Sequence, residues 1–161
     1  MGHIQASGVC KSYERPGKGC GRSRETLQAL SGASFSVENN EFVSLLGPSG
    51  CGKSTLLRLL AGLDRDYEGD IIIDGVDVKQ FRTPVCYMLQ KDYLMPWRTL
   101  LENVLLPLEI KGADLREEAE RIAPLVREFG LEGFENYRPD ALSGGMRQRA
   151  ALLRTYLMTG D

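Results

Sequence analysis

Two clusters of glycine hold the residues best suited to chemistry, and the first runs from Gly47 to Thr55. Its order, Gly-Pro-Ser-Gly-Cys-Gly-Lys-Ser-Thr, fits G-x-x-x-x-G-K-[ST] at every defined position. Glycines let the backbone fold tightly enough to aim several N–H groups at phosphate oxygens, and a following helix start adds partial positive charge. In such a loop Lys53 neutralises the β- and γ-phosphates, and the Ser54 hydroxyl is placed to bind Mg²⁺. The spacing therefore predicts a nucleotide-phosphate site.

The second cluster lies in Leu142-Ser143-Gly144-Gly145-Met146-Arg147-Gln148-Arg149. Ser143 is a good N-cap residue, and two glycines at a helix start leave backbone N–H groups uncovered by side chains. This arrangement would form a second anion site. On these residues alone, an ordinary capped helix with a flexible start is an equally good interpretation, because such caps are common.

Composition and charge narrow the classes of protein to which the chain could belong. The 161 residues carry 20 Lys+Arg and 22 Asp+Glu, and a net charge of -2 gives no support for electrostatic nucleic-acid binding. No apolar run is long enough to span a bilayer, and the N-terminus shows no signal-peptide pattern. The four cysteines form no C-x-x-C pair and His3 is the only histidine, which disfavours a zinc site or a Cys–His nucleophile. Reduced thiols in a cytosolic protein are expected.

The elements that must position these residues are strands in the first half of the chain. Alternating or continuous apolar patterns predict strands at 3–13, 27–37, 42–46, 70–74 and 85–89. The run Phe42–Leu46 is almost continuously apolar, as in a strand covered on both faces, and it leads directly into the first glycine cluster. A helix is expected over 56–63, a turn at Gly75, and a loop at 14–26.

After Gln90 the pattern changes to helices. The expected helix starts are Thr99, Asp114 and Ser143, and the first two are followed three residues later by Glu, as in a capping box. Pro107 is expected to kink or end the first of these helices, and Pro124 to kink the second. One apolar face of the last helix contains Met146, Ala150, Leu153 and Leu157.

The two glycine clusters and their order along the chain resemble those of the ATP-binding cassette (ABC) ATPases, and the resemblance covers essentially the whole chain. Gly47–Thr55 matches their Walker A loop, and its residue sequence is one that is common in importers. Leu142–Gln148 looks like their signature motif. Gln90 matches the Q-loop glutamine, and Tyr13 resembles the aromatic residue that stacks on adenine. For Tyr13 an ordinary strand-end aromatic is the alternative.

The resemblance implies an α/β fold: a P-loop NTPase core with an antiparallel β subdomain and an α-helical signature subdomain, its C-terminal part missing. The expected division is a nucleotide-binding core with the β subdomain at 1–90, a helical subdomain at 91–145, and a helix returning to the core at 146–161.

In this family two ATPase domains pair head to tail around ATP, so a homodimer is expected. The resemblance implies catalytic roles for Lys53 and Gln90 and Mg²⁺ binding by Ser54 and Gln90. The implied ATP contacts are Tyr13, Gly47, Ser49, Gly50, Cys51, Gly52, Lys53, Ser54 and Thr55 from one domain, with Ser143, Gly144, Gly145 and Gln148 from its partner. Contacts made only in the ATP-bound state would shift the dimer between two populations.

The segment Gln90–Val104 resembles the Q-loop region of importers for nitrate, sulfonate, taurine and related compounds. In that group this surface receives a membrane permease subunit, which implies a cytoplasmic protein on the inner face of the membrane and no nucleic-acid partner. Leu94, Met95 and Trp97 are the apolar residues expected at the permease contact. Core packing of these three is an equally good interpretation.

Some family features have no match. The sequence lacks a Walker B strand ending in Asp-Glu, a D-loop and a switch histidine. We therefore expect the chain to be truncated before Walker B and to lack the general base. Slow hydrolysis and an unpaired sheet edge that makes the chain unstable are expected. The alternatives to an importer ATPase are a soluble non-transport ABC ATPase and a nucleotide-binding fragment without hydrolysis.

Overall fold

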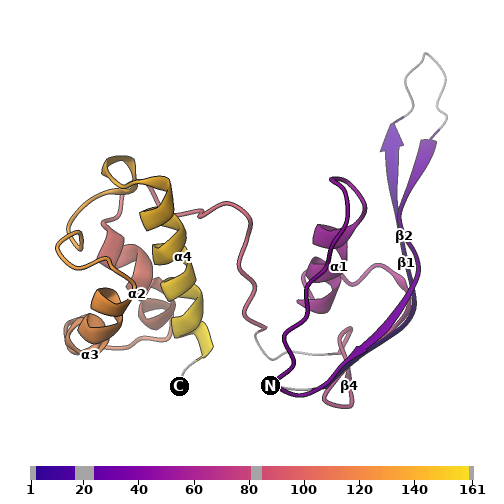
Figure 1. Ribbon diagram of the computed structural model, residues 1–161, viewed down its shortest axis with the longest axis horizontal. Helices are drawn as coiled ribbons and strands as arrows, with labels where there is room; N and C mark the ends of the chain where they lie inside the picture. Colours follow the sequence, from indigo (N-terminus) through magenta and orange to yellow (C-terminus); the bar gives the residue numbers. More distant parts are fainter. Residues whose placement is uncertain (1–2, 17–23, 81–84, 160–161) are drawn as a thin grey trace. The chain divides into compact units, whose positions relative to one another are not determined.

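The computed structural model describes residues 3–16, 24–80 and 85–159 (Figure 1). The chain divides into two compact units, residues 1–85 and residues 86–161. Each unit has its own cluster of buried apolar side chains, so each is described by itself. The second unit includes Gln90 and the last helix.

The first unit is built on an antiparallel sheet whose strand order is β2-β1-β3-β4. The strands are β1 (Ile4–Pro16), β2 (Arg24–Val37), β3 (Glu68–Ile73) and β4 (Val76–Asp77). The strands expected at 3–13, 27–37 and 70–74 are confirmed, and the chain turns at Gly75 as predicted. The ends of β1 and β2 extend into the expected loop at 14–26, and the remainder of that loop lies outside the described residues.

Helix α1 (Lys53–Leu60) follows the first glycine cluster and confirms the helix expected there. Its Leu59 is fully buried and packs with side chains from β1 and β3. Period-two alternation in β3 turns Ile71 and Ile73 to the same buried face. The buried members of this cluster among the described residues are Ala6, Val9, Leu59, Tyr67, Ile71, Ile73 and Val78.

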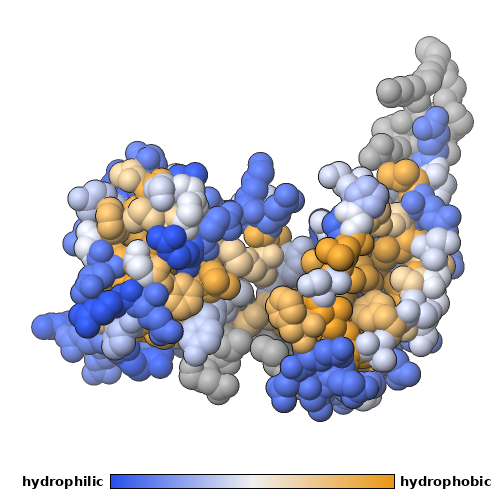
Figure 2. All heavy atoms as spheres, viewed as in Figure 1, coloured by the Kyte–Doolittle hydropathy of each residue, from blue (hydrophilic) through white to orange (hydrophobic). Residues whose placement is uncertain are grey.

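The strands predicted at 42–46 and 85–89 are wrong: both segments are irregular in the structure. A continuously apolar strand forms only where neighbouring strands take its backbone hydrogen bonds and both faces are covered. Within the described ranges no strand pairs with either segment. Phe42 and Leu46 are each 92% exposed, and Figure 2 shows apolar surface on this unit near α1.

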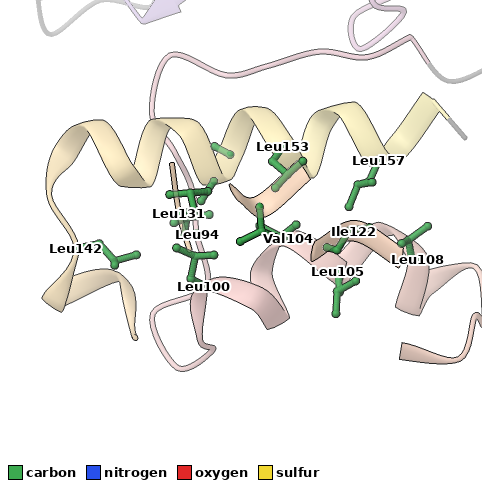
Figure 3. Close-up of a cluster of buried hydrophobic side chains, with 13 residues drawn as sticks. Leu94, Leu100, Val104, Leu105, Leu108, Ile122, Leu131, Leu142, Leu153 and Leu157 are labelled. Carbon is green, nitrogen blue, oxygen red and sulfur yellow. The ribbon is translucent and has the colours of Figure 1, made fainter. Parts of the chain in front are cut away.

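The second unit is helical. It contains α2 (Leu100–Ile110), α3 (Leu115–Glu128), a short 3₁₀ turn (Pro139–Ala141) and α4 (Gly144–Thr159). Their apolar faces meet in one core, with α4 packed against α2 (Figure 3). The buried members are Leu94, Leu100, Val104, Leu105, Leu108, Ile122, Val126, Leu131, Leu142, Ala150, Ala151, Leu153 and Leu157.

The predicted helix starts are confirmed. Thr99 and Glu102 form a reciprocal capping box at α2, and the Asp114 carboxylate accepts from the backbone at the start of α3. Helix α2 continues for three residues beyond Pro107. The proline removes one backbone hydrogen bond of the helix, and packing of the helix in the core can offset that loss. Helix α3 likewise runs through Pro124. None of the helices in the described part of the chain is long and apolar enough to cross a membrane.

Candidate functional site

The first glycine cluster forms an exposed loop that leads into α1. Gly52 stands before the helix with φ near 94°, and among the described residues no side chain caps the start of α1. A Cβ atom at Gly52 would lie 2.4 Å from the carbonyl oxygen of Ala29 and 2.8 Å from Cδ2 of Leu30. Only glycine fits here, because β2 lies directly against the loop. The helix start is therefore held on the sheet with its N–H groups free to bind an anion.

Lys53 folds back over this loop. Its Nζ donates to the carbonyl oxygens of Gly47 and Pro48, both at 2.7 Å, and lies 3.4 Å from the sulfur of Cys51. The ammonium is thus held against the backbone of the loop, where it could meet a bound phosphate group. The residues from Gly47 to Thr55 that the sequence predicts at a phosphate site lie together in this loop and the first turn of α1.

Tyr13 belongs to β1, the strand that pairs with the β2 residues against Gly52. In the β1–β2 pairing, Lys11 stands opposite Leu30 and Tyr13 opposite Leu27. Leu27 is two residues from Ala29, the residue that touches Gly52, which corresponds to about 7 Å along a strand. The partly exposed Tyr13 is therefore on the strand beside the stretch of β2 that lies against Gly52.

The residues of the loop fit a magnesium ion that arrives with a nucleotide. Ser54 is exposed in the first turn of α1 and offers a hydroxyl oxygen, the donor type that Mg²⁺ accepts. Among the described residues, no group of three His, Cys, Asp or Glu side chains could hold a metal by itself. Phosphate oxygens would then supply most of the ion's ligands, with Ser54 as a protein ligand, and the bound ion would neutralise phosphate charge.

The second glycine cluster begins α4 in the other unit. The Ser143 hydroxyl accepts from the N–H of Met146 at 3.3 Å, which confirms the predicted N-cap. Gly144 and Gly145 form the exposed first turn of the helix. Backbone N–H groups at one exposed helix start would suit an anion, as expected from the sequence.

Gln90 and α4 are joined within the second unit. The side-chain amide of Gln148 donates to the carbonyl oxygen of Gln90 at 3.3 Å. Gln148, expected to contact ATP, therefore faces the Q-loop backbone, while the Gln90 residue itself is exposed. The structure thus places Gln90 beside the helix that Ser143 starts, whereas Tyr13 and Lys53 belong to the other unit.

Two arginines of α4 that were not predicted as site residues also bind the segment after Gln90. Arg147 pairs with Asp92 at 3.1 Å and donates to the carbonyl oxygen of Leu142 at 2.7 Å. Arg154 donates to the carbonyl oxygens of Asp92 at 2.7 Å and Tyr93 at 3.0 Å. Burial lowers the pKa of Arg154, and the charge of Asp92 opposes that shift. The spacing of Arg147 and Arg154, which places both on one helix face, was the signal available in the sequence.

The three residues expected at a permease contact differ in position. Leu94 is 8% exposed and belongs to the helical core, which corrects the expectation of a surface contact for it. Met95 is half-buried, and its backbone is bonded to the buried side chain of Asn103. Trp97 is 68% exposed. It borders a hollow of about 550 Å³ that also includes Leu101, Leu105, Leu115 and Ala119.

Several curated relatives of this chain are named as import or ABC transporter ATP-binding proteins. The aliphatic sulfonates import ATP-binding protein SsuB of Bacillus anthracis is 42% identical over 132 residues, covering 82% of this chain and 51% of the relative. The formylaminopyrimidine import ATP-binding protein ThiZ of Halalkalibacterium halodurans is 49% identical over 124 residues, covering 77% and 47%. An uncharacterized ABC transporter ATP-binding protein of Methanocaldococcus jannaschii is 46% identical over 129 residues, covering 80% and 48%. The chain spans about half the length of these curated relatives.

Solved structures agree with this result. The ATP-binding cassette MJ0796, in a dimeric post-hydrolysis state bound to ADP and Pi, has a TM-score of 0.81 and is 33% identical, covering 97% of this chain and 70% of that one. The expected α/β architecture with an antiparallel sheet and a helical part is therefore confirmed. The family described as ABC transporter matches residues 30–161, which include both glycine clusters and Gln90, and the chain belongs to this family of ATP-binding cassettes.

Proposed function

We propose that this chain is the ATP-binding part of an importer subunit that couples ATP binding and hydrolysis to solute uptake through membrane permease partners. Relatives named as sulfonate and formylaminopyrimidine import proteins support the importer class. The observation that carries the ATP-binding role is the loop before α1, where Lys53 lies against the loop carbonyls of Gly47 and Pro48 and Gly52 is held against β2.

ATP binding is tested by Lys53→Ala. Removing an ammonium that bonds charged phosphates costs about 10- to 100-fold in affinity. Calorimetry of the purified protein with Mg²⁺ and ATP measures this loss. Lys111→Ala is the matched control, because it removes an exposed lysine of the other unit that is bonded to the Met158 carbonyl. Equal affinity in the Lys53→Ala variant and the unaltered protein would refute a phosphate role for this loop.

Hydrolysis is a separate part of the proposal. Lys53 would neutralise charge on the β- and γ-phosphates, and Gln90 would orient the reacting phosphate with its Mg²⁺. ATP turnover should be measured apart from ATP binding. Turnover that disappears in Lys53→Ala supports an ATPase, whereas binding without turnover favours the alternative of a nucleotide-binding fragment.

We further propose that two such domains pair head to tail, so that Ser143, Gly144, Gly145 and Gln148 meet ATP held by the partner's loop. The dimeric structures of similar cassettes and the exposed helix start at Gly144 support this arrangement. In this proposal the first unit is the nucleotide-binding core with the β subdomain, and the second is the helical subdomain. ATP-dependent dimerisation, measured by light scattering and lost in Ser143→Arg, tests it.

The permease would meet the hollow beside Trp97, with Met95 near it, at the inner face of the cell membrane. The exposure of Trp97 and the apolar part of the hollow's lining, beside the charged residues Arg98, Glu102 and Glu109, support this surface. Capture of the full-length subunit by its permease, reduced in Trp97→Ala, tests the contact. Recovery with ribosomes or DNA instead would favour the non-transport alternative.

A nitrate-, sulfonate- or taurine-like solute is the proposed cargo, and uptake assays with each would identify it.

A further inference from the structure

Lys11 is a buried lysine in the middle of β1. Its side chain is only 4% exposed, and its Nζ lies 3.1 Å from a carboxylate oxygen of Asp64 and 3.2 Å from one of Asp66. The same ammonium donates to the carbonyl oxygen of Asp66. A buried ammonium persists only when its charge and its donors are matched, and these contacts match them.

The partners of Lys11 join two elements that matter for the nucleotide site. Asp64 and Asp66 follow shortly after α1, the helix that begins at Lys53. Lys11 therefore connects β1 to the chain that leaves the phosphate-loop helix. Helix α1 is fixed at its start by Gly52 against β2 and after its end by this lysine.

Lys11 also contacts Tyr13. The two residues are two positions apart on β1 and so share a face of the strand. The Nζ of Lys11 lies over the Tyr13 ring, 5.0 Å from its centroid, within the range of a cation–π interaction. The ammonium thus holds the ring from one side while it is itself anchored by the two carboxylates.

The backbone of Lys11 completes the link. It pairs with Leu30 of β2, the residue whose side chain lies against Gly52. One residue therefore touches the Tyr13 ring, pairs with the strand under the phosphate loop and holds the exit of α1. Such a residue fixes the distance between an aromatic ring and a phosphate site.

We propose that Lys11 is a positioning residue for the nucleotide base: it fixes the Tyr13 ring relative to the Lys53 loop so that base and triphosphate bind together. This inference rests on the proposed ATP-binding function. Preorganised contacts at both ends of a ligand raise affinity because the protein does not have to order them on binding. Lys11 then acts on the base through Tyr13 and has no direct effect on the phosphates.

The test compares ATP with inorganic tripolyphosphate, which has the phosphates but no base. In Lys11→Met, ATP affinity measured by calorimetry should fall about five- to tenfold, and tripolyphosphate affinity should stay unchanged. Tyr13→Ala should give the same selective loss, and the double variant should lose no more than Tyr13→Ala alone. Lys11→Arg, which keeps a cation over the ring, should recover part of the ATP affinity.

Lys79→Met is the matched control. Lys79 also places its Nζ over a tyrosine, 4.3 Å from the Tyr67 ring centroid in the same unit, and its ammonium bonds the Gly69 carbonyl of β3 and not the Tyr13 ring. Both ligands should bind this variant as they bind the unaltered protein. Should Lys11→Met fail to fold, Asp64→Asn replaces it, because it loosens the anchor of Lys11 and should give the same selective loss.

Equal loss of ATP and tripolyphosphate affinity in Lys11→Met would overturn the inference and show a general structural role. Unchanged affinity for both ligands would overturn it as well. Failure of the unaltered protein to bind either ligand would refute the proposed function itself, which is a different result from both.

Discussion

At the scale of single residues, two lysines of the first unit occupy opposite surroundings. Lys53 is partly exposed and bonded to neutral groups of its own loop, so its charge is available to a ligand. Lys11 is buried and its charge is matched by Asp64 and Asp66. The same residue type is therefore suited to binding in one place and to positioning in the other, because the surroundings decide which role it can take.

The Lys11–Asp64 pair predicts how stability depends on pH. Burial acts to lower the pKa of Lys11, but bonds to Asp64 and Asp66 outweigh it and raise that pKa above 10.5. Burial likewise acts to raise the pKa of Asp64, but the backbone N–H of Asp66, Lys11 and the charge of Arg58 lower it below 3.8. The stabilisation is fully present between these ordinary values. It is lost as pH rises through the raised pKa of Lys11 or falls through the lowered pKa of Asp64.

Urea unfolding of the unaltered protein and Lys11→Met across pH measures this dependence. The variant should be less stable at neutral pH by about 1–3 kcal/mol, below the cost of breaking a fully buried pair because Asp66 is exposed. The difference should shrink at both extremes of pH. A constant difference at all pH values would contradict a charge-based role.

At the scale of elements, the start of α2 depends on one buried amide. Asn103 is fully buried, its Oδ1 accepts from the N–H of Met95 at 2.6 Å, and its Nδ2 donates to the carbonyl oxygens of Met95, Arg98 and Thr99. All of its hydrogen-bonding groups are used on the segment that precedes the helix. Asn103 therefore shapes the chain between Gln90 and α2 from within the core.

Asn103→Ala should destabilise the helical unit by about 1–3 kcal/mol, because it leaves the Met95 N–H without its partner. Thr99→Ala, which removes only the N-cap of α2, should cost about 1 kcal/mol. Circular dichroism during urea unfolding compares the two. A cost for Asn103→Ala no greater than that for Thr99→Ala would show that the amide network is dispensable.

The helix starts could be predicted correctly because their signals are local. Thr99, Asp114 and Ser143 start helices through hydrogen bonds made within three residues, so spacing alone identifies them. The strands expected at 42–46 and 85–89 depend on neighbours distant in sequence, and an apolar run carries no record of whether such neighbours are present.

The candidate site divides in the same way. The phosphate loop was predictable because Gly47 to Ser54 follow each other in sequence and Gly52 has a backbone reason to be glycine. The role of Lys11 was not, because its partners Asp64 and Asp66 lie 53 and 55 residues away. For Leu94 the sequence left two interpretations open, a surface contact and a core position. Only the packing in the structure distinguishes them, and it places Leu94 in the core.

At the scale of the whole molecule, the two hydrophobic clusters share no residue, and each lies within one unit. Leu153 is fully buried in the helical cluster, and Ile71 is fully buried in the cluster of the sheet unit. Truncating either leucine or isoleucine to alanine in a packed core costs about 2–5 kcal/mol. Because the clusters are separate, we expect each loss to stay within its own unit.

Hydrogen exchange followed by mass spectrometry reads the two units separately in the same sample. Leu153→Ala should speed exchange in α2 and α4 and leave β1 and β3 unchanged, with ATP affinity at the Lys53 loop preserved. Ile71→Ala should do the reverse and also weaken ATP binding, because β3 pairs with the strand that carries Lys11 and Tyr13. Faster exchange throughout the chain in both variants would show that the units unfold as one cooperative body, and separate cores would then not mean separate stabilities.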